Sequence, residues 1–542
     1  MNVMIMKCKL AHLLVFLSLC TPFLMADNVT LEAESKDSKE VHVTYDKLVE
    51  ELKHVHRLKS ILNLLTWDER VNMPDQSADF RALQQGTLAR LVYREFTKQE
   101  IGGYLNVLES NGDQLSSAQR ALIRETRRKY DRKKSLSEEF VARKKEMESK
   151  GYQAWKKARD ENDFMLFAPV LEEILVMARE EAGHVGYADD PYAYWVDRYD
   201  PGFSVKDIDQ YFGELKSGIA PIVAQIQASS VKPSRDILKG FSVKKQKVFI
   251  TEVISRIGFD FEQGRLDKTI HPFCGGSSED CRITVNYAKD APLFSVFGGL
   301  HEAGHGLYEQ GQPEQYLGTP LGEALVMAMH ESQSRLWENQ IGHSRVFWEY
   351  WEGEYRRLFY RQLRDISSED FYRAINAVEV NPVRVQSDEV TYNLHVILRY
   401  ELEKKLLDGS LQVRDLPVAW NKLSEELLGY TPKNDMEGVL QDVHWSIGAF
   451  GYFPSYALGN MIAAQLWAQL RQDIPNVDEE IALGNFAPVL VWLRENIHQY
   501  GKQYSTKELV KMATGKEMSS QYFLEYLSER YLPLYVGDGE EG

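Results

Sequence analysis

Cysteine is scarce in this sequence, which contains only 4 cysteines among 542 residues. Cys8 and Cys20 lie near the N-terminus, and the other two are Cys274 and Cys281. A fold that is held together by disulfide bonds needs a denser set of cysteines. The sequence therefore predicts a protein stabilised by its hydrophobic core, and it leaves open one disulfide, between Cys274 and Cys281, in an oxidising compartment.

An excess of basic residues is also missing. The 64 lysines and arginines are outnumbered by 80 aspartates and glutamates, so the formal net charge at pH 7 is -16. The field of such a protein repels phosphate backbones and anionic lipid surfaces. We therefore expect no nucleic-acid partner.

Long apolar runs are absent, with one short exception at the N-terminus. Lys7 and Lys9 precede an apolar run at residues 10–19, and the small residue Ala26 precedes a polar stretch. The run is shorter than the roughly 20 residues of a membrane-spanning helix, and its flanks are those of a secretory signal peptide. We predict a signal peptide at residues 1–26 and export to the periplasm or the medium without a stable membrane anchor. Without a genuine signal peptide, the protein would be cytoplasmic.

Strand-like alternation, repeats and low-complexity linkers are rare in the rest of the chain. Apolar residues recur every three or four positions, for example at residues 45–65 and 116–134, which is typical of amphipathic helices. The sequence predicts an all-α fold, with one mainly helical domain over residues 27–542. The exception is DCRITVNY, residues 280–287, whose alternation predicts a strand. This strand either pairs with an extended peptide or belongs to a small structural hairpin.

A candidate metal centre lies in FGGLHEAGHGLYEQG, residues 297–311. His301 and His305 would share one face of a helix, so both imidazoles can bind one ion. Glu302 can then act as general base toward a water molecule on that ion. The motif specifies only three positions, and two histidines with no metal function remain the alternative at this point.

Two neighbouring features bear on this centre. Gly298, Gly299, Gly304 and Gly306 weaken the helix, and we interpret them as places where backbone or substrate comes close, rather than as packing positions alone. A catalytic zinc also needs a third protein ligand. The segment LGEALVMAMHESQSRLWENQ offers three candidates, and residue chemistry leaves the choice open among them: Glu323, His330 and Glu331.

Seven segments resemble the carboxypeptidase Taq family of metallocarboxypeptidases, and they occur in the order of that family. They are LTWDERVNMP from Leu65, HPF from His271, D-x-R-x-T from Asp280, HEAGHGLYEQG from His301, HESQSRLWEN from His330, NPVRVQSDEVTYNLHVILRYELE from Asn381 and DVHWSIGAFGYFPSYALGN from Asp442. The resemblance implies a metal-dependent carboxypeptidase that removes C-terminal residues from peptides with broad specificity. It also implies a helical fold similar to that of neurolysin, with a groove between two lobes and a small sheet at its edge, and a homodimer.

The resemblance assigns roles around the metal. Glu331 becomes the third ligand beside His301 and His305, and His330 becomes a packing or hydrogen-bonding neighbour. One divalent ion is implied, for which zinc is expected, although cobalt suits the same ligands. Glu302 keeps its role as general base.

Further residues are assigned to the substrate. Tyr456 and His444 are similar to the donors that stabilise the oxyanion in this fold group, and Tyr452 is a second phenol that could take this part. Arg384 matches the arginine that binds the free C-terminal carboxylate. Asp388 and Glu389 follow it closely in the sequence, and we expect them to orient it. Two more residues are expected to line the groove: Arg282 and His271.

Some positions depart from the pattern of the family. Gln386 replaces the usual Glu, Cys281 the usual Val, and Asn286 a common Arg. None of them is a proposed ligand, so activity is still expected. Two alternatives remain: an endo- or dipeptidyl-type metallopeptidase on the same fold, and an inactive protein that binds peptides or metal.

Overall fold

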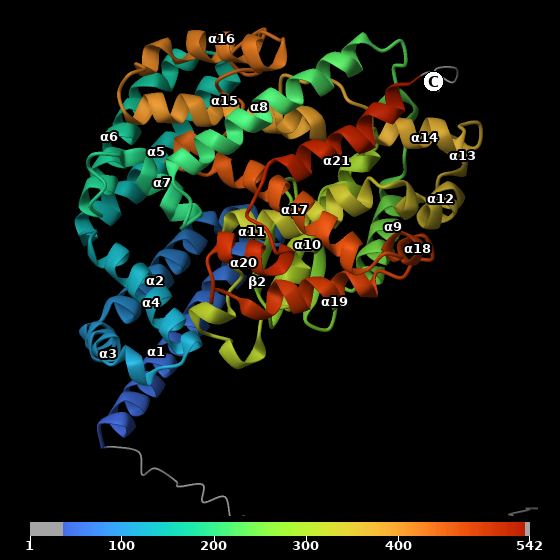
Figure 1. Cartoon of the computed structure of the whole chain (residues 1–542). Helices are drawn as coiled ribbons and strands as arrows, with labels where there is room; N and C mark the ends of the chain where they lie inside the picture. The colour runs from blue at the N-terminus through green and yellow to red at the C-terminus, as the bar shows by residue number, and fades with distance from the viewer. Residues whose placement is uncertain (1–35, 537–542) are drawn as a thin grey trace, which may run out of the picture.

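The computed structural model describes residues 36–536, so the predicted signal peptide at residues 1–26 lies outside the described part of the chain. Helices dominate this part (Figure 1), which confirms the predicted all-α class. The helices before the sheet are α1 (Lys36–Val71), α2 (Ala78–Thr97), α3 (Gln99–Ser110), α4 (Ser117–Lys134), α5 (Glu138–Glu161), α6 (Ala168–His184), α7 (Pro191–Tyr199), α8 (Val205–Ala228) and α9 (Val243–Arg256). The helices after it are α10 (Pro292–Gln310), α11 (Met327–Arg335), α12 (Arg345–Leu358), α13 (Tyr360–Leu363), α14 (Ser368–Ile375), α15 (Glu389–Leu407), α16 (Leu416–Leu428), α17 (Phe453–Asp473), α18 (Val477–Ala482), α19 (Ala487–Asn496), α20 (Thr506–Thr514) and α21 (Gln521–Tyr531).

Two hydrophobic cores organise these helices. The smaller core joins the N-terminal helices α1 to α4 to Leu321, and the larger core contains most of the remaining elements. Lys129 of α4 and Lys502 both donate to the carboxylate of Glu323, at 2.5 and 2.8 Å. Glu323 lies in the segment that leads into α11, so this ion-pair cluster holds the N-terminal helices against that segment. Within residues 36–536, no helix combines the length and the apolar character needed to cross a membrane.

The small sheet has three strands in the order β1-β3-β2, namely β1 (Gly264–Lys268), β3 (Asp280–Val285) and β2 (Cys274–Ser277). β1 is parallel to β3, and β2 is antiparallel to it. Both edges of β3 are therefore occupied by neighbouring strands. Of the two interpretations of DCRITVNY, pairing of this strand with a peptide is wrong, and the structural hairpin is right.

Three of the four glycines of α10 lie in close contacts. A Cβ atom on Gly304 would lie 2.7 Å from the carbonyl oxygen of Gln333 in α11, and one on Gly306 would lie 2.6 Å from the ring of Phe259. Gly299 faces the side chain of Ile250, whereas a Cβ on Gly298 would meet no atom within 4 Å. The interpretation of these glycines is therefore right for the backbone approach at Gly304. For Gly299 and Gly306 the interpretation is wrong, because both glycines make room for neighbouring side chains.

A buried aspartate connects α11 with α17. Asp200 accepts hydrogen bonds from the backbone N–H of Ala328, at 2.7 Å, and from the hydroxyl of Ser455, at 2.5 Å. Ala328 lies in the first turn of α11, and Ser455 lies in the first turn of α17. The N-terminal ends of the two helices are thereby held together, although the chain separates them by more than a hundred residues.

Candidate metal centre

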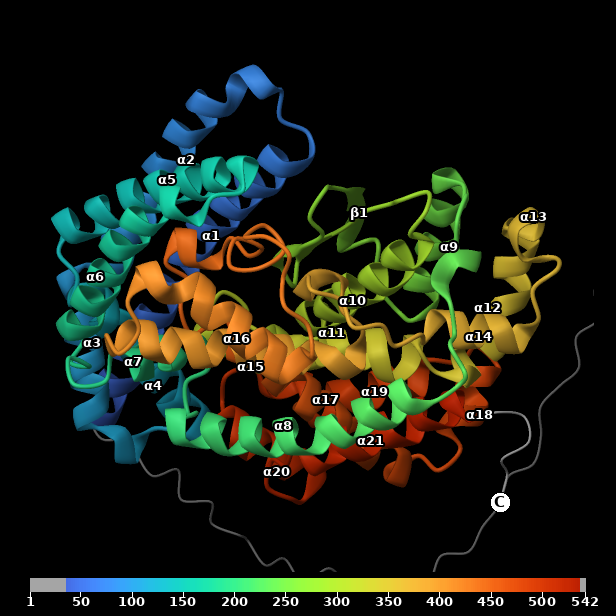
Figure 2. The same cartoon turned by 90° about the horizontal axis from the view of Figure 1, so that it is seen from above.

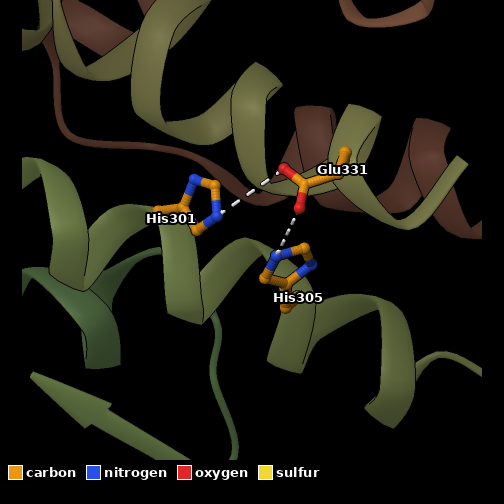
Figure 3. A group of neighbouring side chains, drawn as sticks. All are labelled: His301, His305 and Glu331. Atoms are coloured by element: carbon orange, nitrogen blue, oxygen red, sulfur yellow. Dashed lines mark ion pairs between the residues drawn. The ribbon is translucent and has the colours of Figure 1, made fainter. Parts of the chain in front are cut away.

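Three potential ligands converge between α10 and α11. His301 and His305 project from one face of α10, and Glu331 of α11 points between them (Figure 3). The Nε2 atoms of His301 and His305 lie 3.8 and 3.9 Å from the two carboxylate oxygens of Glu331. Ligand atoms placed about 2.1 Å from one tetrahedral ion are roughly 3 to 4 Å apart. The spacing therefore suits a single metal ion.

The surroundings of Glu331 also fit a cation. Its side chain is buried, and its Oε2 atom has no hydrogen-bond partner within residues 36–536. The nearest cation is Arg335, whose Nε atom lies 3.8 Å from this oxygen, too far for a hydrogen bond. A buried carboxylate oxygen without a donor is costly, and a divalent ion would supply the missing partner. Two imidazoles and one carboxylate form a donor set that suits zinc. Of the three candidates for the third ligand, Glu331 is the one in this cluster. Glu323 is held by lysines, and the ring nitrogens of His330 face His305 and Glu309.

His301 is oriented by a carboxylate that sequence reasoning did not single out. Its Nδ1 atom lies 2.7 Å from Oε2 of Glu338, which also accepts a hydrogen bond from Arg335 at 3.0 Å. Burial would raise the pKa of Glu338, but Arg335 and His301 lower it to about 2. Glu338 lies in a π-helical turn, Leu336–Gly342, that directly follows α11, and such turns are frequent at functional sites.

His305 is oriented by a second imidazole. Its Nδ1 atom lies 2.5 Å from Nδ1 of His330, whose Nε2 atom lies 2.9 Å from a carboxylate oxygen of Glu309. Burial and the neighbouring His330 keep the pKa of His305 well below its ordinary value, so this imidazole is neutral. If His305 donates its Nδ1 proton to His330, and His330 donates to Glu309, the Nε2 lone pair of His305 is free for a metal. His330 therefore lies where the resemblance placed it, beside the ligands.

Replacing Glu338 with glutamine is expected to weaken metal binding by about 10- to 100-fold, because residues that orient metal ligands contribute on this scale. The variant removes the charge that holds His301 and leaves all three ligands in place. Competition with a chelator of known affinity would measure the change. Glu426→Gln, at an exposed surface ion pair, serves as the control and should bind metal as the wild type does. Equal metal affinity in Glu338→Gln and wild type would contradict this role.

Glu302 lies beside the cluster without a partner of its own. Its side chain is buried, and no hydrogen bond or ion pair joins it to another side chain within the described residues. Burial raises the pKa of Glu302 to about 7, against the opposing effect of His301. A carboxyl group with such a pKa can both accept and release a proton near neutral pH.

The predicted oxyanion donors form an aromatic group at the start of α17. The rings of Tyr452 and Tyr456 lie 5.3 Å apart, and the ring of His444 lies 5.5 Å from that of Tyr452. Burial raises the pKa of Tyr456, so its hydroxyl remains a donor. Burial also lowers the pKa of His444 to about 4, and its Nδ1 atom has no partner within residues 36–536. The structure thus brings the three predicted residues together.

Arg384 is buried beside this group, and Asp442 orients it. Its Nε and Nη2 atoms donate to Oδ1 of Asp442 at 3.2 and 2.9 Å, and its Nη1 atom donates to the hydroxyl of Tyr392 at 2.8 Å. The guanidinium carbon lies 5.1 Å from the centre of the Tyr456 ring. The other carboxylate oxygen of Asp442 accepts from Arg399 at 2.7 Å. Two guanidinium groups thus share one carboxylate, which leaves an excess positive charge for an anion.

The expectation that Asp388 and Glu389 orient Arg384 is wrong. Asp388 is the N-cap of α15 and accepts from the backbone N–H of Thr391 at 3.0 Å. Glu389 accepts from the hydroxyls of Tyr526 and Tyr531 at 2.9 and 2.7 Å. Asp388 therefore caps α15, and Glu389 binds two tyrosines of α21. The expectation had rested on the proximity of both residues to Arg384 in the sequence.

The two expected groove residues lie around the small sheet. Arg282 of β3 donates to Asp280 at 2.8 Å, and its guanidinium carbon lies 4.2 Å from the ring centre of Trp67 in α1. His271 is exposed in the connection that precedes β2. Neither residue belongs to the cluster of metal ligands. Their part in substrate binding stays a prediction.

Comparison with known proteins identifies close relatives. The family described as "Carboxypeptidase Taq (M32) metallopeptidase" matches residues 47–531. The chain is 37% identical to Carboxypeptidase 1 of Bacillus subtilis over 92% of this chain and 100% of that protein. It is 39% identical to Thermostable carboxypeptidase 1 of Thermus thermophilus, over 91% of this chain and 99% of that protein. The crystal structure of the M32 carboxypeptidase of Deinococcus radiodurans superposes with a TM-score of 0.87 at 36% identity, covering 91% of this chain and 99% of that one. Trypanosoma cruzi metallocarboxypeptidase 1 superposes with a TM-score of 0.85 at 35% identity, covering 90% of this chain and 99% of that one.

Proposed function

Because the chain belongs to the carboxypeptidase Taq (M32) family and is therefore a metallocarboxypeptidase, we propose that it removes residues from free peptide C-termini with Glu302 as general base. The buried guanidinium of Arg384 is the observation that carries this proposal. Arg384 donates to the hydroxyl of Tyr392, whose ring centre lies 4.7 Å from the guanidinium carbon of Arg335, and Nε of Arg335 lies 3.8 Å from the metal-ligand candidate Glu331. A buried positive charge connected to the ligands by these contacts suits a substrate that ends in a carboxylate.

The residues of the site have distinct roles in this reaction. When bound, a divalent ion at His301, His305 and Glu331 supplies a Lewis acid that polarises the scissile carbonyl and acidifies a water molecule. Glu302 accepts the proton of the attacking water and delivers it to the leaving amine. Tyr456 keeps its proton and donates a hydrogen bond to the oxyanion, with His444 and Tyr452 beside it. We expect zinc at the site, although cobalt suits the same donors.

The proposal is tested by incubating the protein with an unblocked peptide and with the same peptide amidated at its C-terminus. Mass spectrometry identifies the products of each. We expect stepwise shortening of the free acid, with little dependence on its last side chain, and much slower shortening of the amidated peptide, because Arg384 recognises the carboxylate. Cleavage inside both peptides would instead support an endopeptidase or a dipeptidyl-type enzyme. No cleavage by protein of verified metal content would contradict the proposed activity.

We further propose that the protein acts after export, as the predicted signal peptide at residues 1–26 indicates. Fractionation of cells that express the full chain, or the chain from residue 27 onward, tests this localisation. We expect the full chain outside the cytoplasm and the shortened chain within it. Equal distribution of the two would contradict export.

We also propose a homodimer. Support comes from the hairpin of α1 and α2, which projects from the body of the molecule (Figure 2) and carries exposed apolar side chains. Phe80 and Leu83 of α2 are 66% and 68% exposed and lie three positions apart on one helix face, so together they offer an apolar surface that a partner can cover. The double variant Phe80→Asp and Leu83→Asp is therefore expected to sediment as a monomer. Val176→Asp, at a position 61% exposed on α6, is the control that should stay dimeric. A double variant that remains dimeric would place the interface elsewhere.

A further inference from the structure

Two cysteines lie in contact behind the metal-binding helix. The Sγ atoms of Cys274 in β2 and Cys281 in β3 are 3.8 Å apart, and both residues are free thiols. They are the two cysteines within residues 36–536. Cys281 is fully buried, whereas Cys274 is partly accessible. The pair therefore combines a fully buried cysteine with one whose residue keeps some exposure to solvent, so Cys274 is the one that a reagent would meet first.

The position of Cys281 connects the pair to the metal centre. Cys281, Ile283 and Val285 form the buried face of β3, which packs on α10. The Sγ atom of Cys281 lies 3.8 Å from the carbonyl oxygen of Gly306, the residue that follows the ligand candidate His305. Cys274 directly follows Phe273, in the connection that carries His271. A disulfide between Cys274 and Cys281 would therefore link the segment before β2 to β3, the strand that packs on α10.

A disulfide between these cysteines needs a small shift of the backbone, and two glycines adjoin Cys274 where the shift would occur. In the sheet register, Cys274 pairs with Ile283 and Gly276 pairs with Cys281, so the two cysteines are diagonal neighbours on adjacent strands. A disulfide has a sulfur–sulfur distance of about 2.05 Å, which requires a further approach of roughly 1.8 Å. Cys274 is followed by Gly275 and Gly276, and Gly276 adopts a φ of 109°. Glycines are the residues that best absorb such a shift, because they lack a side chain that restricts the backbone.

We propose that Cys274 and Cys281 form a reversible disulfide that clips β2 to β3 behind the metal-binding helix. The oxidant is a low-molecular-weight disulfide, to which the proposed export would give access. The sulfur of Cys274, the more exposed of the two residues, attacks one sulfur of the oxidant, breaks its sulfur–sulfur bond and releases one thiol, which leaves a mixed disulfide on Cys274. The Cys281 sulfur then attacks Sγ of Cys274, forms the internal bond and expels the second thiol. The protein loses two electrons to the oxidant, and the protons of its two thiols end on the two released thiols.

Peptide mapping tests the proposal without reference to peptidase activity. Trypsin cleaves after Lys268 and Arg282, so a single tryptic peptide, residues 269–282, contains both cysteines. The folded protein is incubated with oxidised glutathione, quenched with acid, denatured and treated with N-ethylmaleimide before digestion. We expect this peptide to carry no maleimide and to be lighter than its fully reduced form by about 2 Da. After treatment with dithiothreitol, it should carry two maleimides.

Two variants test the order of the steps. Cys281→Val, which keeps an apolar side chain at the buried position, should stop at a glutathione adduct on Cys274. Cys274→Ser should leave Cys281 without glutathione and open to maleimide only after denaturation. In the wild type, a lasting glutathione adduct on Cys274, or two maleimides after oxidation, would overturn the proposal. A disulfide that joins two chains instead of residues 274 and 281 would overturn it as well.

Discussion

Replacing Glu302 with glutamine is expected to lower kcat/KM for release of a C-terminal residue by about 10²- to 10⁴-fold, the range that a general base contributes. Glutamine has nearly the same shape, but it cannot accept the proton of the attacking water. Glu302 makes no hydrogen bond or ion pair with another side chain in the described residues, so the substitution should not disturb the fold. Steady-state kinetics on an unblocked peptide would measure the loss.

The activity of the Glu302 variant can be interpreted only together with its metal content, which is measured on the same protein. We expect this metal content to equal that of the wild type, because the three ligand candidates, His301, His305 and Glu331, remain in place. Wild-type kcat/KM in a fully loaded Glu302→Gln would show that another group accepts the proton. Loss of the metal together with activity would show that Glu302 helps to hold the ion.

Replacing Arg384 with alanine is expected to lower kcat/KM for an unblocked peptide by about 10²- to 10³-fold, as the loss of a buried charge contact does. The slow cleavage of the amidated peptide should hardly change, because that peptide presents no carboxylate to Arg384. The selectivity between the two peptides should therefore collapse. Arg384→Lys is expected to recover part of this selectivity, since lysine keeps the positive charge but cannot make the bidentate hydrogen bonds of arginine.

Controls separate recognition from folding in this experiment. Asp442 keeps its hydrogen bond with Arg399 when Arg384 is removed, so the buried carboxylate is not left without a partner. Arg345→Ala, at a half-exposed arginine that pairs with Glu369 on the surface, should retain wild-type selectivity. Equal losses on both peptides in Arg384→Ala, or a large fall in Tm, would indicate a structural role.

Local patterns account for what could be predicted about the site. The helix through residues 297–311 and the shared face of His301 and His305 follow from helical periodicity, in which positions four apart lie side by side. The third ligand could not be predicted from local patterns. Residue chemistry left Glu323, His330 and Glu331 open, and only the resemblance selected Glu331, because no residue spacing in the sequence indicates that α10 and α11 make contact.

The orienting residues were harder to predict. Glu338, which lies against His301, and Asp442, which holds Arg384, are ordinary acidic residues in helical sequence. The carboxylates nearest to Arg384 along the chain, Asp388 and Glu389, were chosen instead and were wrong. In the folded chain, Asp442 reaches Arg384 across 58 positions, a distance over which sequence proximity carries no information.

Sequence patterns were enough to predict the helical class, the ligand pair on one helix and, through the motifs, the kind of enzyme. These properties depend on periodicity and on residue types at short spacing, where chain geometry leaves little freedom. Contacts between distant segments were needed to establish that β3 is a central strand, that three glycines of α10 serve close packing, and that Cys274 lies against Cys281. Those facts arise when segments meet in space, and the energy that brings them together comes from burial and packing of the whole chain, not from any one segment.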